Sequence, residues 1–474
     1  MKNHWMACIV SFLFLSCMQQ SKKEIDNTAV FTGKAGEIKL IVLAPGHFHA
    51  NLLQKNAIPQ VNDSVHVYAV SPDDAGLIQY LSAIESFNNR VEDPTSWREA
   101  VHAGDDFVDK MVAEKKGNVV VLAGNNKKKT GYILRAVEAG LNVLSDKPMA
   151  INREDFLLLE TAYRNAELKG VQLYDMMTER FDVLNIIEKE LVNNLDFFGE
   201  LKKGTPEDPA IYMESVHHFY KEVLGAPLIR PAWYYDVEQQ GEGIADVTTH
   251  LIDLLFWKFF SKQPVDYTRE IGNISSTHWP TDISQQQFMQ STGESSFPDY
   301  LHKYLDDSTL KVYANGTVNF EVRNHNVGLQ VMWNYQAPEG GGDTFISTLK
   351  GTKAVLKTVQ DKEQNFVKQL YAQKAESVDE KEFAENIQKA VEKIQTRYPF
   401  VSASPTSSSG EYLIHIPVEN REGHDSHFRY VAERFFRYLV NCDMPGWEIA
   451  NTLAKYYITT KAVEVATERK INND

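Results

Sequence analysis

Residues 117–148 restrict the fold of this chain more than any other segment. The apolar run Asn118–Ala123 predicts a buried strand, an amphipathic helix follows, and Gly140 precedes a second apolar run that ends at Asp146-Lys147-Pro148. A strand, a helix and a strand in this order form a βαβ unit, which requires a parallel sheet with a right-handed crossover. The segment therefore predicts an α/β fold.

Two earlier apolar runs extend this sheet. Glu37–Ala44 and Ser64–Val70 predict strands, and helices expected over 75–87 and 105–115 lead to the third strand at Asn118–Ala123. This alternation predicts a doubly wound parallel sheet of the Rossmann type over residues 37–150. Such sheets bind ligands outside the carboxyl ends of their strands.

After Pro148 the pattern changes to short strand-like runs separated by turn signals, which predicts an α+β domain over residues 151–474 with a large, mostly antiparallel open sheet. Asn315-Gly316 predicts a hairpin turn, Ser402–Gly410 a loop and Ala375–Tyr398 a charged helix. The strands expected here are Ala210–Val216, Leu310–Tyr313, Thr317–Arg323, Gly328–Tyr335, Thr344–Leu349 and Ala354–Val359.

The first 17 residues resemble a lipoprotein-type export signal. Lys2 supplies the positive charge, the apolar run Ala7–Leu15 is too short to span a bilayer, and Leu15-Ser16-Cys17 resembles a bacterial lipobox. We expect a lipid anchor at Cys17 in the cell envelope, facing the periplasm, followed by a polar tether over residues 18–36. A cleaved signal on a soluble secreted protein remains the alternative. Only Cys442 would then remain as a free thiol, so no disulfide framework is expected.

The net charge of −15 argues against a nucleic-acid partner, because no basic stripe is present to neutralise phosphates. Lys127-Lys128-Lys129 is the one lysine triplet, and a solvated turn is its simplest interpretation. Membrane contact is expected only through the lipid anchor.

The segment Pro45-Gly46-His47-Phe48-His49 follows the first strand and is the candidate phosphate-binding turn. Dinucleotide-binding turns place glycines where the backbone approaches pyrophosphate, and of those places only Gly46 holds a glycine, with Ala44 and His49 in the flanking ones. After the second strand, where an acidic residue is expected, the chain has Ser71, with Asp73 and Asp74 just beyond. Either aspartate could bind an adenosine ribose hydroxyl.

Lys147 ends a strand at the sheet edge that lines the ligand crevice, where it could bind a substrate hydroxyl and exchange a proton with it. Burial could lower its pKa toward the working pH. A surface lysine without a role is the alternative.

Asp246, His250 and Asp253 share one face of a predicted apolar helix, where polar groups need partners or a cavity. One alternative is that Asp246 caps this helix and His250 is a satisfied core histidine. A metal site is the other, but no third ligand at helical spacing is compelling and His217-His218 is only an adjacent pair, so no metal is predicted.

In combination these segments resemble the glucose–fructose oxidoreductase and inositol dehydrogenase (Gfo/Idh/MocA) family over about residues 38–260. Val119–Asn125 resembles the family's third strand, which ends in an Asn beside the nicotinamide, and Asp146-Lys147-Pro148 resembles its Glu-Lys-Pro motif. Gly241–Asp253 resembles its Gly-rich Asp-x-x-x-His-x-x-Asp segment, and Arg180-Phe181 resembles the Arg-Phe after its substrate-domain strand. Gly423–Phe428 and Pro445–Glu448 resemble a bacterial lipoprotein subgroup with its own C-terminal domain.

The resemblance implies an enzyme that oxidises or reduces sugars or polyols with a nicotinamide cofactor. Lys147 and His250 would act on the reacting hydroxyl, with His250 as base and Asp246 orienting it. Binding of the substrate would involve Arg180, with Trp233, Tyr234, Tyr235 and Asp236 as an aromatic sugar platform, although core packing explains those aromatics equally well. The cofactor would contact Gly46, His47, Phe48, His49, Ser71, Asp73, Asn125 and Lys147.

The choice between NAD and NADP stays open. Because free nicotinamide cofactor is scarce outside the cytoplasm, we expect a tightly held cofactor that is recycled within each turnover. The leading hypothesis is an oxidoreductase acting on a sugar, polyol or glycoside, and a homo-oligomer is expected from the resemblance. An NAD-dependent glycosidase with recycled cofactor and a non-catalytic carbohydrate-binding lipoprotein are the alternatives.

Overall fold

The N-terminal apolar runs form a parallel sheet in the computed structural model, which describes residues 31–223 and 226–471. Six strands lie in the order β3-β2-β1-β4-β5-β6, all pairs parallel, as a doubly wound sheet requires. Because β6 joins this sheet, it continues past residue 150. The strands are β1 Leu40–Leu43, β2 Ser64–Ala69, β3 Arg98–Ala103, β4 Val119–Leu122, β5 Asn142–Ser145 and β6 Leu173–Asp175.

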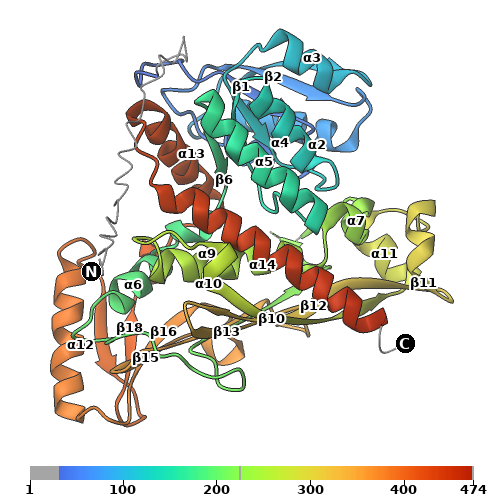
Figure 1. Cartoon of the computed structure of the whole chain (residues 1–474). Coiled ribbons are helices and arrows are strands. Elements are labelled where there is room, and N and C mark those ends of the chain that lie inside the picture. The colour runs from blue at the N-terminus through green and yellow to red at the C-terminus, as the bar shows by residue number, and fades with distance from the viewer. Residues whose placement is uncertain (1–30, 224–225, 472–474) are drawn as a thin grey trace, which may run out of the picture. The chain divides into compact units, whose positions relative to one another are not determined.

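Helices cover both faces of this sheet. Apolar residues of α2 (Ala75–Asn89) pack on one face, and those of α3 (Phe107–Glu114), α4 (Lys129–Glu138) and α5 (Arg153–Lys169) pack on the other. The helix after β1, α1 (His49–Leu52), has only four residues. These strands and helices confirm the predicted Rossmann-type fold (Figure 1).

A ten-stranded sheet forms most of the remaining chain. Its order is β10-β12-β13-β7-β14-β15-β16-β18-β17, with β11 beside β12, and every pair except β13 with β7 is antiparallel. The predicted antiparallel sheet is therefore confirmed. Its strands are β7 Ile211–His218, β10 Ile271–Ile283, β11 Leu305–Asp306, β12 Thr309–Val322, β13 His325–Asn334, β14 Thr344–Lys350, β15 Ala354–Gln360, β16 Gln369–Lys374, β17 Ser402–Pro405 and β18 Glu411–His415.

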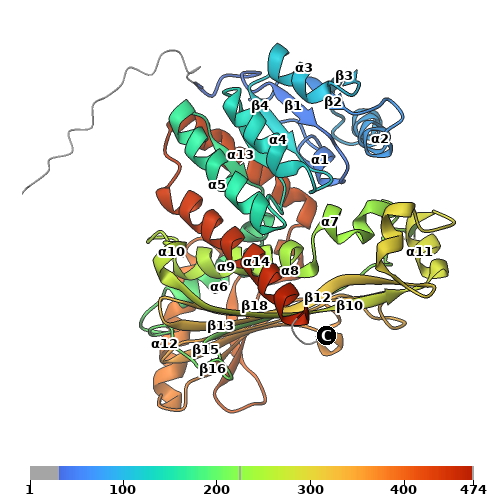
Figure 2. The same ribbon diagram turned by 45° about the vertical axis from the view of Figure 1, so that its right-hand side comes forward.

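Helices on one side of this sheet enclose the largest apolar core, to which α6, α9, α12 and α14 contribute. The long helix α14 (Gly446–Ile471) contacts α5, α9 and β10, and its residues enter the cores of both sheets. Figure 2 shows α14 running from α5 to the antiparallel sheet. The remaining helices are α6 Val183–Val192, α7 Val237–Gln240, α8 Gly243–Asp246, α9 Thr248–Phe259, α10 Tyr267–Glu270, α11 Gln285–Thr292, α12 Glu380–Gln395 and α13 His424–Asn441.

Short elements connect these layers. The strands β8 Glu222–Val223 and β9 Ala226–Pro227 form a small ladder of their own. Five short 3-10 turns complete the list of elements: η1 Thr178–Phe181, η2 Ala232–Tyr235, η3 Asp299–Tyr304, η4 Lys362–Gln364 and η5 Val418–Asn420.

Several local predictions are wrong. The hairpin predicted at Asn315-Gly316 does not form, because β12 continues through it, and a Cβ on Gly316 would lie 2.5 Å from Cγ1 of Ile244. The glycine there permits close approach of α8 rather than a turn. The predicted loop over 402–410 begins with β17, and the strands β3, β10, β16 and β18 were not predicted.

No helix in the described part of the chain combines the length and apolar character needed to cross a membrane. The predicted export signal, with its lipid anchor at Cys17, and the first part of the predicted tether lie outside the described residues.

Candidate active site

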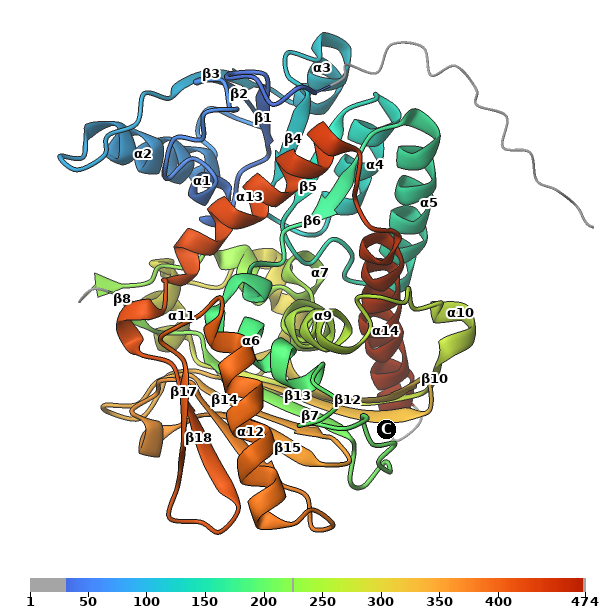
Figure 3. The ribbon, with the colours of Figure 1, turned by 90° about the vertical axis from the view of Figure 1, so that its left-hand side faces the viewer.

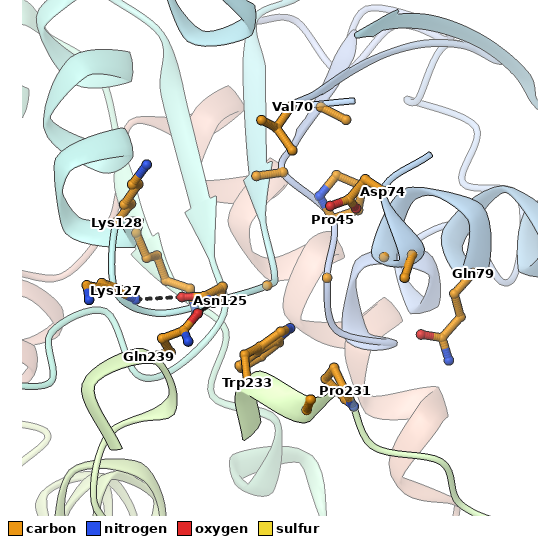
Figure 4. Close-up of a pocket in the computed structure, with 18 of the residues that line it drawn as sticks. Pro45, Val70, Asp74, Gln79, Asn125, Lys127, Lys128, Pro231, Trp233 and Gln239 are labelled. Carbon is orange, nitrogen blue, oxygen red and sulfur yellow. Dashed lines mark hydrogen bonds between the residues drawn. The ribbon is translucent and has the colours of Figure 1, made fainter. Parts of the chain in front are cut away.

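A cavity of about 670 Å³ opens at the carboxyl ends of β1, β2 and β4. Gly46, Asn125 and Trp233, three of the predicted site residues, line it, and Lys127 and Lys128 lie along its edge (Figure 4). Asn125 Nδ2 donates a hydrogen bond to Gln239 Oε1 at 2.7 Å, which joins the β4 loop to α7. The cavity has the size and the place in the fold of a cofactor or substrate site.

The turn after β1 contains one position that favours glycine and one close backbone contact, although it lacks most glycines of a dinucleotide-binding turn. Ala44 has a φ of +48°, the left-handed conformation that a glycine adopts without strain. A Cβ on Gly46 would lie 3.4 Å from the Cα of Gly124, so these two backbones pack directly together. Gly46 and His47 both donate their N–H groups to the Ala123 carbonyl, at 3.1 and 3.2 Å, so these two donors are already used within the protein.

The side chains of His47 and His49 both lie against the carboxylate of Asp146. Nδ1 of His49 lies 3.0 Å and Nδ1 of His47 3.6 Å from Oδ2 of Asp146. The ligand atoms of the three residues lie within 4.8 Å of one another, which is the spacing of a metal site, although an ordinary His–Asp hydrogen bond has the same geometry. Phe48, at the start of α1, is 42% exposed.

At the end of β2, Asp74 lines the cavity, whereas the predicted Ser71 and Asp73 lie outside its lining. Ser71 Oγ accepts a hydrogen bond from the Asp73 N–H at 3.2 Å. Asp74 also caps α2, because its Oδ1 accepts a hydrogen bond from the Leu77 N–H. Of the two aspartates considered from the sequence, the structure brings Asp74 to the cavity.

Lys147 and Asp246 meet across 99 positions of sequence, with Lys147 Nζ 2.6 Å from Asp246 Oδ1. Both side chains are largely buried. Burial alone would lower the pKa of Lys147, but the carboxylates of Asp246 and Asp146 raise it above its usual value. The expectation that burial lowers the pKa of Lys147 toward the working pH is therefore wrong, and Lys147 remains an ammonium.

The local sequence explains how Asp246 reaches Lys147. Gly243 begins α8, and a Cβ on it would lie 1.8 Å from the Ala314 carbonyl oxygen, so only glycine lets α8 pack this closely on β12. Asp246 is the last residue of α8, and the N-cap of α9, the helix that carries His250, is Val247, with no side-chain cap hydrogen bond. The alternative interpretation of Asp246 as a helix cap is therefore wrong.

His250 lies in the first turn of α9, where the charges of Lys147 and Asp246 affect its pKa. Burial and the Lys147 charge lower the pKa of His250 to about 3, opposed by the carboxylates of Glu179 and Asp246. Its Nδ1 atom is buried and has no hydrogen-bond partner, so the predicted orientation of His250 by Asp246 is not made through this atom. His250 is therefore a neutral imidazole with an unused buried nitrogen, and buried polar atoms without partners are uncommon.

Arg180 and Asp253 lie in a different cluster. Arg180 makes two hydrogen bonds of 2.6 Å to Asp253 and one of 2.7 Å to Glu448, all between buried side chains. Lys455 adds ion pairs to Asp253 and Asp175 at 3.0 and 2.8 Å. The structure places Arg180 in a closed ion-pair network that joins η1, α9 and α14, away from the lining of the cavity.

A family model described as "Putative oxidoreductase C terminal domain" matches residues 187–467, more than half of the chain. The chain belongs to this oxidoreductase family. The crystal structure of "a putative oxidoreductase from Parabacteroides merdae ATCC 43184" is 46% identical, with a TM-score of 0.91 over 93% of this chain and 100% of the other. No match is found among curated proteins.

More distant solved structures share the fold of this family member. Biliverdin reductase from Synechocystis sp. PCC 6803, in complex with biliverdin and NADP+, is 10% identical with a TM-score of 0.54, over 91% of this chain and 99% of the other. GenD2 from gentamicin A biosynthesis, in complex with NAD, is 12% identical with a TM-score of 0.55, over 93% of this chain and 97% of the other. These likenesses support the fold.

The aromatic residues predicted to form a sugar platform do not lie together in this oxidoreductase: one lines the cavity and two are part of the apolar core. Trp233 lines the cavity, whereas Tyr234 and Tyr235 are buried in an apolar cluster. Tyr235 stacks on Phe219, with ring centroids 5.0 Å apart, and its hydroxyl bonds to Ser291. Asp236 is buried and caps α7.

Three groups near the site were missed from the sequence. Lys129, from the triplet interpreted as solvated, is buried with Nζ 3.2 Å from the Asp146 carbonyl, and burial lowers its pKa to about 8. Glu179 and His424 face each other at 3.5 Å and act electrostatically on His250. Glu179 directly precedes Arg180, and His424 lies in the Gly423–Phe428 segment, so both are next to residues that carry the family resemblance.

Proposed function

We propose that this chain is a nicotinamide-dependent oxidoreductase that acts on a hydroxyl group of a sugar, polyol or glycoside. The observation that carries the proposal is the buried Lys147–Asp246 ion pair, to which the neutral His250 is electrostatically coupled, at the same edge of the parallel sheet as the cavity, whose lining includes none of the three. An ammonium, the carboxylate that holds it, and a neutral imidazole with an unused nitrogen are the groups needed to bind an alcohol and take its proton.

In this mechanism Asp246 positions Lys147, whose ammonium donates a hydrogen bond to the reacting oxygen. His250, neutral because of burial and the Lys147 charge, accepts the hydroxyl proton. A bound nicotinamide supplies the hydride acceptor. The charge of Lys147 then stabilises negative charge that develops on the oxygen in the buried site.

The cavity fits a dinucleotide, and the side chains around it favour NAD. Its volume of about 670 Å³ lies within the range of cofactor sites. Gly46 would let pyrophosphate approach the turn, and Asn125, Lys127 and Lys128 would supply side-chain donors. Asp74 lines the end of β2, and residues 69–89 contain no Lys or Arg to bind a 2′-phosphate, so we propose NAD rather than NADP.

The proposal includes a tightly held cofactor, a lipid anchor at Cys17 and assembly as a homo-oligomer. Tight binding is tested by releasing small molecules from the purified protein and measuring nicotinamide absorbance. Metabolic labelling with a fatty acid tests the anchor, with Cys17→Ser as control. Light scattering tests the oligomer.

The function is tested with a screen of sugars, polyols and glycosides that follows reduced-nicotinamide fluorescence in cofactor-loaded protein. We expect reduction with at least one of these compounds, and loss of it in Lys147→Met. Full turnover in that variant would contradict the assignment of Lys147. Cleavage of a glycoside without net cofactor reduction would favour the NAD-dependent glycosidase, and sugar binding without cofactor or turnover would favour the carbohydrate-binding lipoprotein.

A further inference from the structure

Helix α13, from the end of the chain, occupies the place of the first Rossmann helix. In a doubly wound fold the helix after β1 runs back along the sheet, but here α1 has only four residues. Phe428, Val431 and Phe435 of α13 pack in the same apolar cluster as Leu40 and Val42 of β1. Figure 3 shows α13 extending past α1 along the strands.

The direction of α13 follows from contacts at its two ends. At its N-terminus the His424 and His49 rings lie 5.9 Å apart, and Asp425 pairs with Lys55, beside the carboxyl end of β1. Near its C-terminus Gln172 donates a hydrogen bond to the Tyr438 carbonyl, just before β6 begins. The first turn of α13 therefore lies at the same sheet edge as Lys147.

This first turn brings His424 to Glu179. Nδ1 of His424 lies 3.5 Å from Oε1 of Glu179, and Lys368 Nζ lies 3.5 Å from Oε2 of the same carboxylate. The side chains of His424 and Glu179 are 44% and 22% exposed, unlike those of the closed Arg180 network. The His424 ring lies 5.9 Å from that of His49, and His49 Nδ1 lies 3.0 Å from Oδ2 of Asp146, the residue before Lys147. Glu179 and His424 also affect the pKa of His250. The four groups therefore share one environment.

We propose that Glu179 and His424 form a second substrate subsite, which binds two neighbouring hydroxyls of the same molecule whose reacting hydroxyl lies at Lys147 and His250. This inference rests on the proposed function and narrows its substrate class to neutral compounds that carry at least three hydroxyl groups. Helix α13 thus supplies part of the substrate specificity.

The charges of these groups suit a neutral ligand. Burial raises the pKa of Glu179, but the surrounding positive charge, of which Lys368 is the largest part, lowers it by more, so the carboxylate is ionised and can accept hydrogen bonds from two hydroxyls. Burial lowers the pKa of His424 to about 4, so its imidazole is neutral and can either donate or accept. Because Lys368 balances Glu179, the subsite has no net charge to attract an ionic substrate.

The test uses cofactor-loaded protein with methyl glycopyranosides and their monodeoxy analogues as probes. For the glycoside that is turned over, we expect His424→Ala to raise KM about 10-fold and to leave kcat within twofold, because a hydrogen bond to a non-reacting hydroxyl of the substrate is lost. For the analogue that lacks the contacted hydroxyl, His424→Ala should change KM less than twofold. Glu179→Gln should behave in the same way, and His424→Gln should restore most of the affinity.

His415→Ala and Glu419→Gln, at exposed positions, are the matched controls and should change no constant. An unchanged KM in His424→Ala, or an equal rise for the glycoside and every deoxy analogue, would overturn the subsite. If Glu179→Gln fails to fold, the KM of His424→Ala still tests the subsite, because His424 is half-exposed and its replacement should not prevent folding.

The outcome also separates the subsite from the proposed function. If a glycoside binds but is never oxidised, the proposed function fails, and calorimetric binding to wild type and His424→Ala still tests the subsite. If a glycoside is oxidised and His424→Ala has no effect, only the subsite fails. If no glycoside binds, both fail.

Discussion

Two charged clusters each contain one residue of α9, Asp253 in one and His250 in the other, and these two side chains differ in how completely their polar atoms are paired. In the Arg180 network, Arg180 bonds to both oxygens of Asp253 and to Glu448, and Lys455 pairs with Asp253 as well. In the other cluster, Lys147 has one close carboxylate partner, Asp246, and the buried Nδ1 of His250 has none. Asp246, His250 and Asp253 belong to one sequence motif, yet the structure divides them between the two clusters.

The difference separates structure from chemistry. A buried ion pair whose partners are all present holds elements together, and removing one partner is costly. A buried nitrogen without a partner is uncommon, and under the proposed function it accepts the proton of the substrate hydroxyl. The residues assigned from the motif therefore have different expected phenotypes, which can be measured.

The largest expected effect is on turnover at the open cluster. Lys147→Met keeps the buried stem of the side chain and removes the ammonium, so kcat should fall about 10³-fold. Because the change also leaves the buried carboxylate of Asp246 without its close partner, the thermal midpoint should fall as well, and the rate is compared at a temperature where the variant is folded. Stopped-flow fluorescence of the reduced nicotinamide measures the rate, and a loss of less than tenfold would place the chemistry elsewhere.

At the closed network the effect should be on stability. Arg180→Met leaves the buried carboxylates of Asp253 and Glu448 without their main partner, which should cost about 3–5 kcal/mol of unfolding free energy. Urea unfolding measures it. The matched control, Arg269→Met, removes an exposed arginine that pairs with Asp266 and should cost at most about 1 kcal/mol. If Arg180→Met stays stable but loses substrate affinity, Arg180 belongs to the substrate site as predicted from the sequence.

His250→Asn should lower kcat about 10²-fold, because it removes the proton acceptor and leaves Lys147 in place. The measurement also has a pH signature. With a pKa of about 3, His250 is protonated, and therefore inactive as a base, only when the pH falls toward that value. Wild-type kcat/KM should therefore be flat between about pH 5 and pH 8, and an acid limb near the ordinary histidine pKa would contradict the assigned environment.

The smallest expected effect concerns the cofactor turn. A methyl group on Gly46 would lie near Gly124 and Trp233 without severe overlap, so Gly46→Ala should fold normally. It should weaken NAD binding about tenfold, because it fills the surface that pyrophosphate approaches. Gly131→Ala, where nothing lies within 4 Å, is the control. Unchanged NAD affinity in Gly46→Ala would show that the dinucleotide does not use this turn.

The parallel sheet was predictable because its central strands are apolar runs, as in β1 and β4. The edge strand β3, Arg98–Ala103, was missed because most of its side chains face solvent and its sequence has no apolar run. Gly316 was interpreted as a turn residue because close packing against Ile244, 72 positions away, cannot be seen in local sequence.

The candidate site, like the fold, could be predicted from the sequence only in part. Lys147, Asp246 and His250 follow from their positions after a strand and on one helical face, and the structure brings them together. The same helical face also predicted Asp253, whose partners Arg180, Glu448 and Lys455 come from distant elements. The position of α13 against β1 joins residues nearly 400 positions apart, and no local pattern indicates it.

A double-mutant cycle of Lys147→Met and His250→Asn on kcat/KM is the most direct test that both groups act on one alcohol. If they do, the double variant should lie within about threefold of the slower single variant, because groups that act as a unit are not additive. Losses that multiply, to about 10⁵-fold, would mean that the two groups act independently and would contradict the proposed site.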